Sequence, residues 1–260
     1  MTNDPLGADA ILERVRRVYG TCFSCQDTGE VEFVMSTGPR PCKRVTLRKL
    51  FRTAFVRPDR FRFEFREMIA GPESEWLRCV ILSDGSSFRS WMATDRALEI
   101  KDPLDRALAG ATEISGGSAC AIPSQLRMNV AWSEFLPEPS RTEFIGKEII
   151  DGRECFVVRT TPRGRDPNMF WVDAQHFLIR RTRTAGPPDQ DQRQVFLDRR
   201  HAIAEVIRET EDLPPDMRVE MLNIFEEPVL PQIASDLTTH YRPRVDASVD
   251  DANWSFEPPC

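Results

Sequence analysis

The sequence lacks any run of apolar residues that approaches the roughly 20 needed to span a bilayer as a helix. Its first residues, MTNDPLGADAILERV, contain neither the basic start nor the apolar stretch that a secretory signal requires. We therefore expect no membrane span. We also expect a cytoplasmic location, or a periplasmic one if an export signal has been removed.

Motifs for catalysis and metal binding are also missing. The chain has three histidines, His176, His201 and His240, and none belongs to an HExxH motif or another spaced cluster. It contains no GxSxG nucleophile elbow, phosphate loop or GxGxxG fingerprint. We expect no catalytic residue, no metal ligand and no cofactor, and a protein that is not an enzyme.

The cysteines do not form an obvious framework. There are seven of them, an odd number, in a chain long enough not to need disulfides. Cys22 and Cys25 have CxxC spacing, but they follow an expected helix and precede an expected strand, which reverses the redox context. No second CxxC completes a zinc site. We interpret them as buried thiols, with a local disulfide, a redox pair or a metal site as alternatives.

What is present is typical of a folded protein. Hydrophobic residues make up 40% of the chain and charged residues 29%, enough for a packed core. The formal net charge is -6, whereas nucleic-acid binders concentrate Lys and Arg on one face. We expect no nucleic-acid partner.

Hydrophobic periodicity predicts a protein rich in strands. Phe61, Phe63 and Phe65 alternate with charged residues, which indicates a half-buried antiparallel strand with its arginines on the solvated side. Asp151-Gly152 is the strongest hairpin signal. Strands are expected at residues 31–35, 45–57, 61–65, 76–82, 88–93, 142–150, 155–161, 169–173, 178–184, 237–241 and 254–256. Without regular βαβ alternation, a doubly wound parallel sheet is unsupported.

Helices are expected at fewer places. Residues 9–19 have apolar residues at helical spacing, with Asp9 as the N-cap. Asp102 followed by Pro103 predicts a short helix that ends at residue 109. A second helix is expected at residues 120–130. Charged, amphipathic helices are expected at residues 195–211 and 215–225.

The order of these elements resembles the LolA/LolB-like outer-membrane lipoprotein carriers and their lipoprotein-sorting relatives. The similar segments are residues 54–65, 82–85 with Trp91, 145–152, 156–162, 170–173, 178–181 and 254–259. They include a Pro-containing turn before an alternating aromatic strand, two Asp-Gly turns and a last segment that looks like the closing strand. The resemblance implies a strongly curved antiparallel β-sheet, a half-barrel wrapped around helices, with an apolar cavity that receives acyl chains. We expect one LolA-like α+β domain over residues 1–260, with a C-terminal helical insertion at residues 192–228.

One aromatic face of this sheet is the expected ligand site. A sheet can bury such a face only against helices or against a ligand. A closed core is the alternative, because buried aromatic residues usually serve packing. The candidate ligand-binding residues are Phe33, Phe61, Phe63, Phe65, Phe88, Trp91, Phe156, Val158, Phe170 and Val172.

Three functions follow from this pattern. The first is binding or carrying of an apolar ligand, with a lipid or an acylated protein as partner. The second is a sensor or scaffold that binds a partner protein through the same fold, with the helical insertion as its docking surface. The third is a thiol-dependent enzyme that uses Cys22 and Cys25.

Overall fold

The computed structural model describes most of the chain in separate stretches. These are residues 6–37, 43–67, 77–91, 103–115, 117–126, 139–162, 167–186 and 234–255, with residues 204, 205, 207, 208, 215, 218, 219 and 222.

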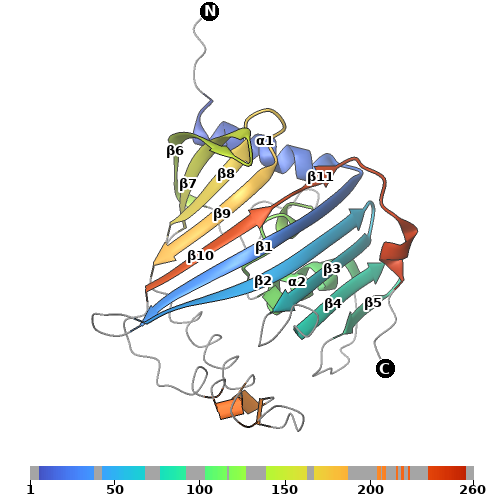
Figure 1. The fold of residues 1–260 in the computed structure, drawn as a ribbon. Coiled ribbons are helices and arrows are strands. Elements are labelled where there is room, and N and C mark those ends of the chain that lie inside the picture. The colour runs from blue at the N-terminus through green and yellow to red at the C-terminus, as the bar shows by residue number, and fades with distance from the viewer. Residues whose placement is uncertain are drawn as a thin grey trace, which may run out of the picture.

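The described strands form a single antiparallel sheet (Figure 1). Its strands are β1 Ser24–Thr37, β2 Lys43–Val56, β3 Arg60–Glu67, β4 Leu77–Asp84, β5 Phe88–Trp91, β6 Pro139–Ile150, β7 Arg153–Pro162, β8 Asn168–Asp173, β9 Ile179–Gly186, β10 Ala234–Tyr241 and β11 Arg244–Val245. Their order is β5-β4-β3-β2-β1-β10-β9-β8-β7-β6, and β11 also pairs with β1. The sheet is open, with β5 and β6 at its two edges.

The helices define two faces of the sheet. Helix α1, Ala8–Thr21, contacts β6 and β7, and helix α2, Pro103–Ser115, contacts β3, β4 and β5. The short 3₁₀ helix η2, Pro123–Gln125, contacts both of them. Figure 1 shows the curled sheet with α2 behind it and α1 along one end, and the face that these helices cover is called the inner face. A second 3₁₀ helix, η3 at Asp251–Trp254, contacts β3 and β4 from the outer face.

Strand alternation sends apolar side chains inward. On β3, Phe61, Phe63 and Phe65 join a core cluster that also contains side chains of α1 and α2 and of Ile122 and Leu126, which flank η2. Burying a Phe side chain stabilises a fold by roughly 1.5–3 kcal/mol, so these contacts hold the helices on the sheet. The predicted curved antiparallel sheet with helices on one side is confirmed.

The sequence predicted that the outer face of β3 is exposed to solvent, but part of this face is buried. Arg62 is buried, and its guanidinium donates hydrogen bonds to the carbonyl oxygens of Asn253 and Ser255 and to Glu64. Glu64 is also buried and accepts hydrogen bonds from Arg66 and Arg78. The prediction failed here because it considered β3 alone and did not include the C-terminal segment that covers it.

The expected helices differ from the observed ones at their ends. Helix α1 begins after Gly7, which has no side-chain cap, and Asp9 instead accepts a hydrogen bond from the Thr142 hydroxyl. Helix α2 continues beyond residue 109 to Ser115. Within residues 120–126 only the 3₁₀ turn η2 forms, and residues 127–130 lie outside the described residues.

The expected strand at residues 254–256 is wrong for Trp254. This residue ends the 3₁₀ helix η3, whose N-cap Asp250 accepts a hydrogen bond from the backbone N–H of Ala252. A capped turn therefore competes successfully with the strand pattern. Phe256 lies outside the described residues, as do Trp76 and residues 92–93 of the other expected strands.

The expected insertion at residues 192–228 falls between β9 and β10. Its described residues are helical, and Ala204 and Ile207 are buried. The rest of the range lies outside the described residues, so the extent and role of the insertion stay a prediction.

Candidate functional site

The inner face brings the three phenylalanines of β3 together in a packed stack. Phe61 and Phe63 are 0% exposed and Phe65 is 1% exposed. The ring of Phe63 lies between those of Phe51 and Phe65, with centroid distances of 6.2 and 6.1 Å. These rings are close enough to fill the space beneath α2, as a core does.

A second group of predicted residues lies on the same face but far across the sheet. Phe156 and Val158 on β7 pair with Val172 and Phe170 on β8, and all four are buried. The ring of Phe156 stacks on that of Phe177 at 6.0 Å. Strands β2, β1, β10 and β9 separate this group from β3. One contiguous core cluster nevertheless contains both groups.

The centre of the inner face depends on a glycine. Gly29 on β1 lies between Phe51 on β2 and Tyr241 on β10, its partners in register. A Cβ atom at Gly29 would come within 2.2 Å of the Phe51 ring, so only glycine allows this ring to cross β1. The Phe51 and Tyr241 rings then meet edge to face at 5.4 Å. Phe51 was missed in the sequence, although its alternation with Phe55 was a usable signal.

Phe33 lies near the C-terminal end of β1, where its surroundings differ from those of the packed core. It pairs with Leu47 on β2 and with Leu237 on β10, so the three side chains lie side by side on the inner face. All three are only half-buried, whereas Val31, two residues earlier on β1, is 0% exposed. We call Phe33, Leu47 and Leu237 the half-buried row.

The last two predicted residues, Phe88 and Trp91, lie on opposite faces of β5. Phe88 pairs with Ser83 and packs against the core cluster. Trp91 pairs with Val80, which alternates with the inward-facing Cys79 and Ile81, and therefore lies on the outer face. The prediction that Trp91 shares the inner face with the other candidate residues is therefore corrected. Residues three positions apart in a strand cannot share a face.

The inner face also carries an ion pair that the sequence did not predict. Lys49 on β2 and Glu67 on β3 are register partners, with 2.7 Å between Lys49 Nζ and Glu67 Oε1. Their side chains are only 12% and 9% exposed. Lys49 Nζ also lies 5.6 Å from the centroid of the Phe65 ring, within the range of a cation–π contact.

A buried carboxyl group lies at the other end of β1. Asp27 is 2% exposed on the inner face, and its Oδ1 accepts a hydrogen bond from the backbone N–H of Arg242 at 2.8 Å. Among the described residues, its Oδ2 and the hydroxyl of its register partner Thr53 have no hydrogen-bond partner. Burial raises the pKa of Asp27 to about 8. This carboxyl group is therefore mainly protonated at neutral pH.

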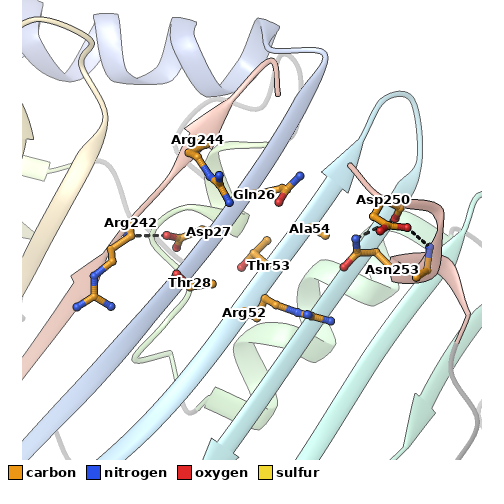
Figure 2. A pocket seen from close by; sticks show the side chains of 11 residues that line it. Gln26, Asp27, Thr28, Arg52, Thr53, Ala54, Arg242, Arg244, Asp250 and Asn253 are labelled. Carbon is orange, nitrogen blue, oxygen red and sulfur yellow. Dashed lines mark hydrogen bonds between the residues drawn. The ribbon is translucent and has the colours of Figure 1, made fainter. Parts of the chain in front are cut away.

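The outer face contains a polar hollow of about 280 Å³ (Figure 2). Asp27 and Thr53 border it, although strand alternation directs their side chains to the inner face. The other lining residues are Gln26, Thr28, Arg52, Ala54, Arg242, Arg244, Asp250, Ala252 and Asn253. In Figure 2, Arg52 extends toward Asn253, and the guanidinium of Arg242 points away from the other lining side chains. This polar lining does not suit an apolar ligand.

The geometry gives no support to thiol chemistry. Cys22 and Cys25 are buried and free, and the thiol of Cys22 donates to the carbonyl oxygen of Tyr19. Burial raises the pKa of the Cys22 thiol and raises that of Cys25 well above its ordinary value. A nucleophilic cysteine needs the opposite shift.

The described residues contain neither a metal-binding cluster nor a helix able to span a membrane. Within them, no group of three or more His, Cys, Asp or Glu residues is arranged to hold a metal ion. The helices among them are all too short or too polar to cross a bilayer.

The architecture is that of an open antiparallel sheet curled around helices, and several solved structures are similar to the chain at low identity. The MucA/MucB complex of Pseudomonas aeruginosa is 10% identical, with a TM-score of 0.39 over 96% of this chain and 61% of that chain. LprF from Mycobacterium bovis is 10% identical, with a TM-score of 0.41 over 94% of each chain. The LolA superfamily protein NE2245 from Nitrosomonas europaea is 9% identical, with a TM-score of 0.28 over 96% of this chain and 98% of that chain.

A LolA superfamily protein is thus among the structures to which this chain is similar. The chain spans about 60% of the length of the MucB structures. Its sequence matches no family model and no curated protein. The assignment of the fold rests on the strand pairing described above.

Proposed function

We propose that the inner face binds an apolar ligand, such as a lipid or a lipoprotein acyl chain, and that the half-buried row receives it. The observation that carries this proposal is the change in burial of the apolar side chains along the inner face of β1 and β2. Val31 is 0% exposed and Phe51 is 4% exposed, whereas Phe33, Leu47 and Leu237 are half-buried beside them.

A half-buried apolar row next to a filled core is a favourable place for a chain-like ligand. Burying apolar surface against a ligand contributes about 25 cal/mol per Å² to the binding free energy. The packed residues beside the row already form one wall of the site. The ligand would continue the core rather than replace it. In this proposal Phe33 contacts the ligand directly, and the other inward-facing candidates form the packed floor and walls.

The same proposal extends to the domain organisation. The described strands between residues 24 and 245 belong to one sheet, which supports a single LolA-like domain over residues 1–260. Residues 192–228 would then be an insertion between the last two long strands.

The test is a titration with the fluorescent fatty acid cis-parinaric acid, using Phe33→Ala and a matched control. Phe23→Ala removes the same side chain from a site that is 66% exposed and outside the row. We expect saturable binding by the unmutated protein, weakened about fivefold or more by Phe33→Ala, which corresponds to ~1 kcal/mol of lost contact. Phe23→Ala should leave the affinity unchanged. Absence of saturable binding, or equal effects of the two variants, would contradict the proposal.

A further inference from the structure

We infer that the ligand of the inner face is an acidic amphiphile, a single apolar chain with a carboxylate headgroup, and that Lys49 receives this headgroup. The inference rests on the proposed function and adds the chemical class of the ligand. It arises from the position of one ion pair relative to the half-buried row.

Lys49 lies at the boundary between the filled and the half-buried parts of the inner face. It is two residues from Leu47 on β2 and pairs in register with Val31 on β1, whose next inward neighbour is Phe33. A chain lying along Phe33, Leu47 and Leu237 therefore has its end within reach of the Lys49 ammonium group. The Lys49 side chain is 12% exposed, so part of it is not covered by the rest of the protein.

The chemistry of the pair favours an anion over a neutral headgroup. Removing two charges from water is unfavourable, and their mutual attraction seldom compensates for it inside an apolar face. Such a pair therefore gives the fold little stability, whereas an ammonium group in apolar surroundings binds a carboxylate more strongly than a surface lysine does. Glu67 holds Lys49 in place at 2.7 Å, and the Phe65 ring lies beneath the ammonium group.

Glu67 would then set the selectivity of the site. A carboxylate headgroup must share Lys49 with Glu67, so the resident carboxylate competes with the ligand. Replacing Glu67 with a neutral residue of the same shape removes this competition. Replacing Lys49 removes the attraction, and replacing both removes this ion pair from the inner face.

The experiment compares two ligands that differ only in the headgroup, decanoate and decanol. Each displaces the neutral probe 1-aminoanthracene from the full-length protein at neutral pH. The variants are Lys49→Met, Glu67→Gln and the double variant, with Arg48→Met as the control. Arg48 directly precedes Lys49 on β2, lies on the outer face and forms an ion pair with Glu30. Arg48→Met therefore removes the same charge from the opposite face.

We expect decanoate to bind the unmutated protein about tenfold more tightly than decanol, as a charge-assisted contact provides. Lys49→Met should remove this preference by weakening decanoate alone, and Glu67→Gln should strengthen decanoate. Arg48→Met should change neither ligand. If Lys49→Met does not fold because Glu67 loses the Lys49 ammonium group, the double variant provides the same comparison with both members of this ion pair removed.

Two negative outcomes are distinguishable. Equal binding of decanoate and decanol, unchanged in Glu67→Gln and in the double variant, would overturn the role of Lys49 and leave the apolar site intact. Failure of the unmutated protein to bind 1-aminoanthracene, decanoate or decanol would overturn the proposed function and this inference with it.

Discussion

The two ends of the inner face are built from the same strands but have different surroundings. Cys25 on β1 and its register partner Phe55 on β2 are 0% exposed beneath the helices. At the other end of the same two strands, Phe33 and Leu47 face the same side and are half-buried. Alternation along a strand therefore determines which face a side chain joins, and the elements that cover the face determine whether it packs or remains accessible.

The largest difference between the ends should follow from adding a charge. Cys25→Asp places a carboxylate in the covered part, between Phe55 and Val245, where an unpaired buried charge costs several kcal/mol, and we expect little folded protein. Leu237→Asp places the same group in the half-buried row, where water can reach it, and we expect a folded protein that no longer binds cis-parinaric acid. Circular dichroism and the ligand titration check both variants. Equal loss of fold in the two would remove the distinction between the ends.

Truncating an aromatic ring at each end should give a smaller contrast. Phe63→Ala should lower the free energy of unfolding by about 3–5 kcal/mol, because the rings of Phe51 and Phe65 enclose the void that it leaves. Phe33→Ala should lower the free energy of unfolding by about 1–2 kcal/mol, because the Phe33 side chain is only half-buried in the folded protein. Denaturant unfolding of both variants measures this. A loss at Phe33 as large as that at Phe63 would mean that the row is core.

Asp27, at the covered end, should make the free energy of unfolding depend on pH, and the half-buried row contains no such group. Folded Asp27 keeps its proton up to about pH 8, whereas an unfolded chain releases it near pH 4. The folded state binds more protons between these values, so the free energy of unfolding should fall as the pH rises across this window. Asp27→Asn keeps the acceptor for the Arg242 N–H and should remove most of this fall. Unfolding curves at pH 5, 7 and 8.5 compare the two proteins.

Glu64 provides an internal contrast to Asp27. Although burial raises the pKa of Glu64, hydrogen bonds from Arg78 and Arg66 lower it overall to about 2. The stability that it contributes is present above the pKa of the unfolded state and is lost only as the pH falls toward 2. A slope between pH 5 and 8.5 that persists in Asp27→Asn would contradict the assignment of that slope to Asp27.

The smallest effect should come from the thiols at the covered end. Cys22 and Cys25 are 3% and 0% exposed and pack as small apolar side chains. Replacing both with Ala should lower the free energy of unfolding by about 1–2 kcal/mol and leave cis-parinaric acid binding unchanged. In the folded protein both thiols should react slowly with Ellman's reagent. Fast reaction, or loss of binding with stability retained, would support the thiol-based alternative.

The sequence predicted the elements better than it predicted their surroundings. Local signals were enough for the hairpin at Asp151-Gly152 and for the inward face of Phe61, Phe63 and Phe65, because turn chemistry and alternation act between neighbours. They could not reveal that η3 covers Arg62, or that Lys49 faces Glu67, because these contacts depend on strand pairing and on distant segments. Trp91 was placed on the wrong face by grouping aromatic residues without counting their spacing from Phe88. The half-buried row emerged only from the register of three strands, one of which lies far along the chain from the other two.

The position of β10 also determines when the sheet can be completed. Strands β1 to β5 form one half, strands β6 to β9 form the other, and β10 joins them by pairing with β1 and β9. Since β10 begins at residue 234, a growing chain has both halves before it has the strand that joins them. Until then the edges of β1 and β9 offer unpaired backbone groups, which are templates for pairing with other chains. Closure across such a long sequence separation is intrinsically slow, so nascent or truncated chains that lack β10 would be the aggregation-prone species of this protein.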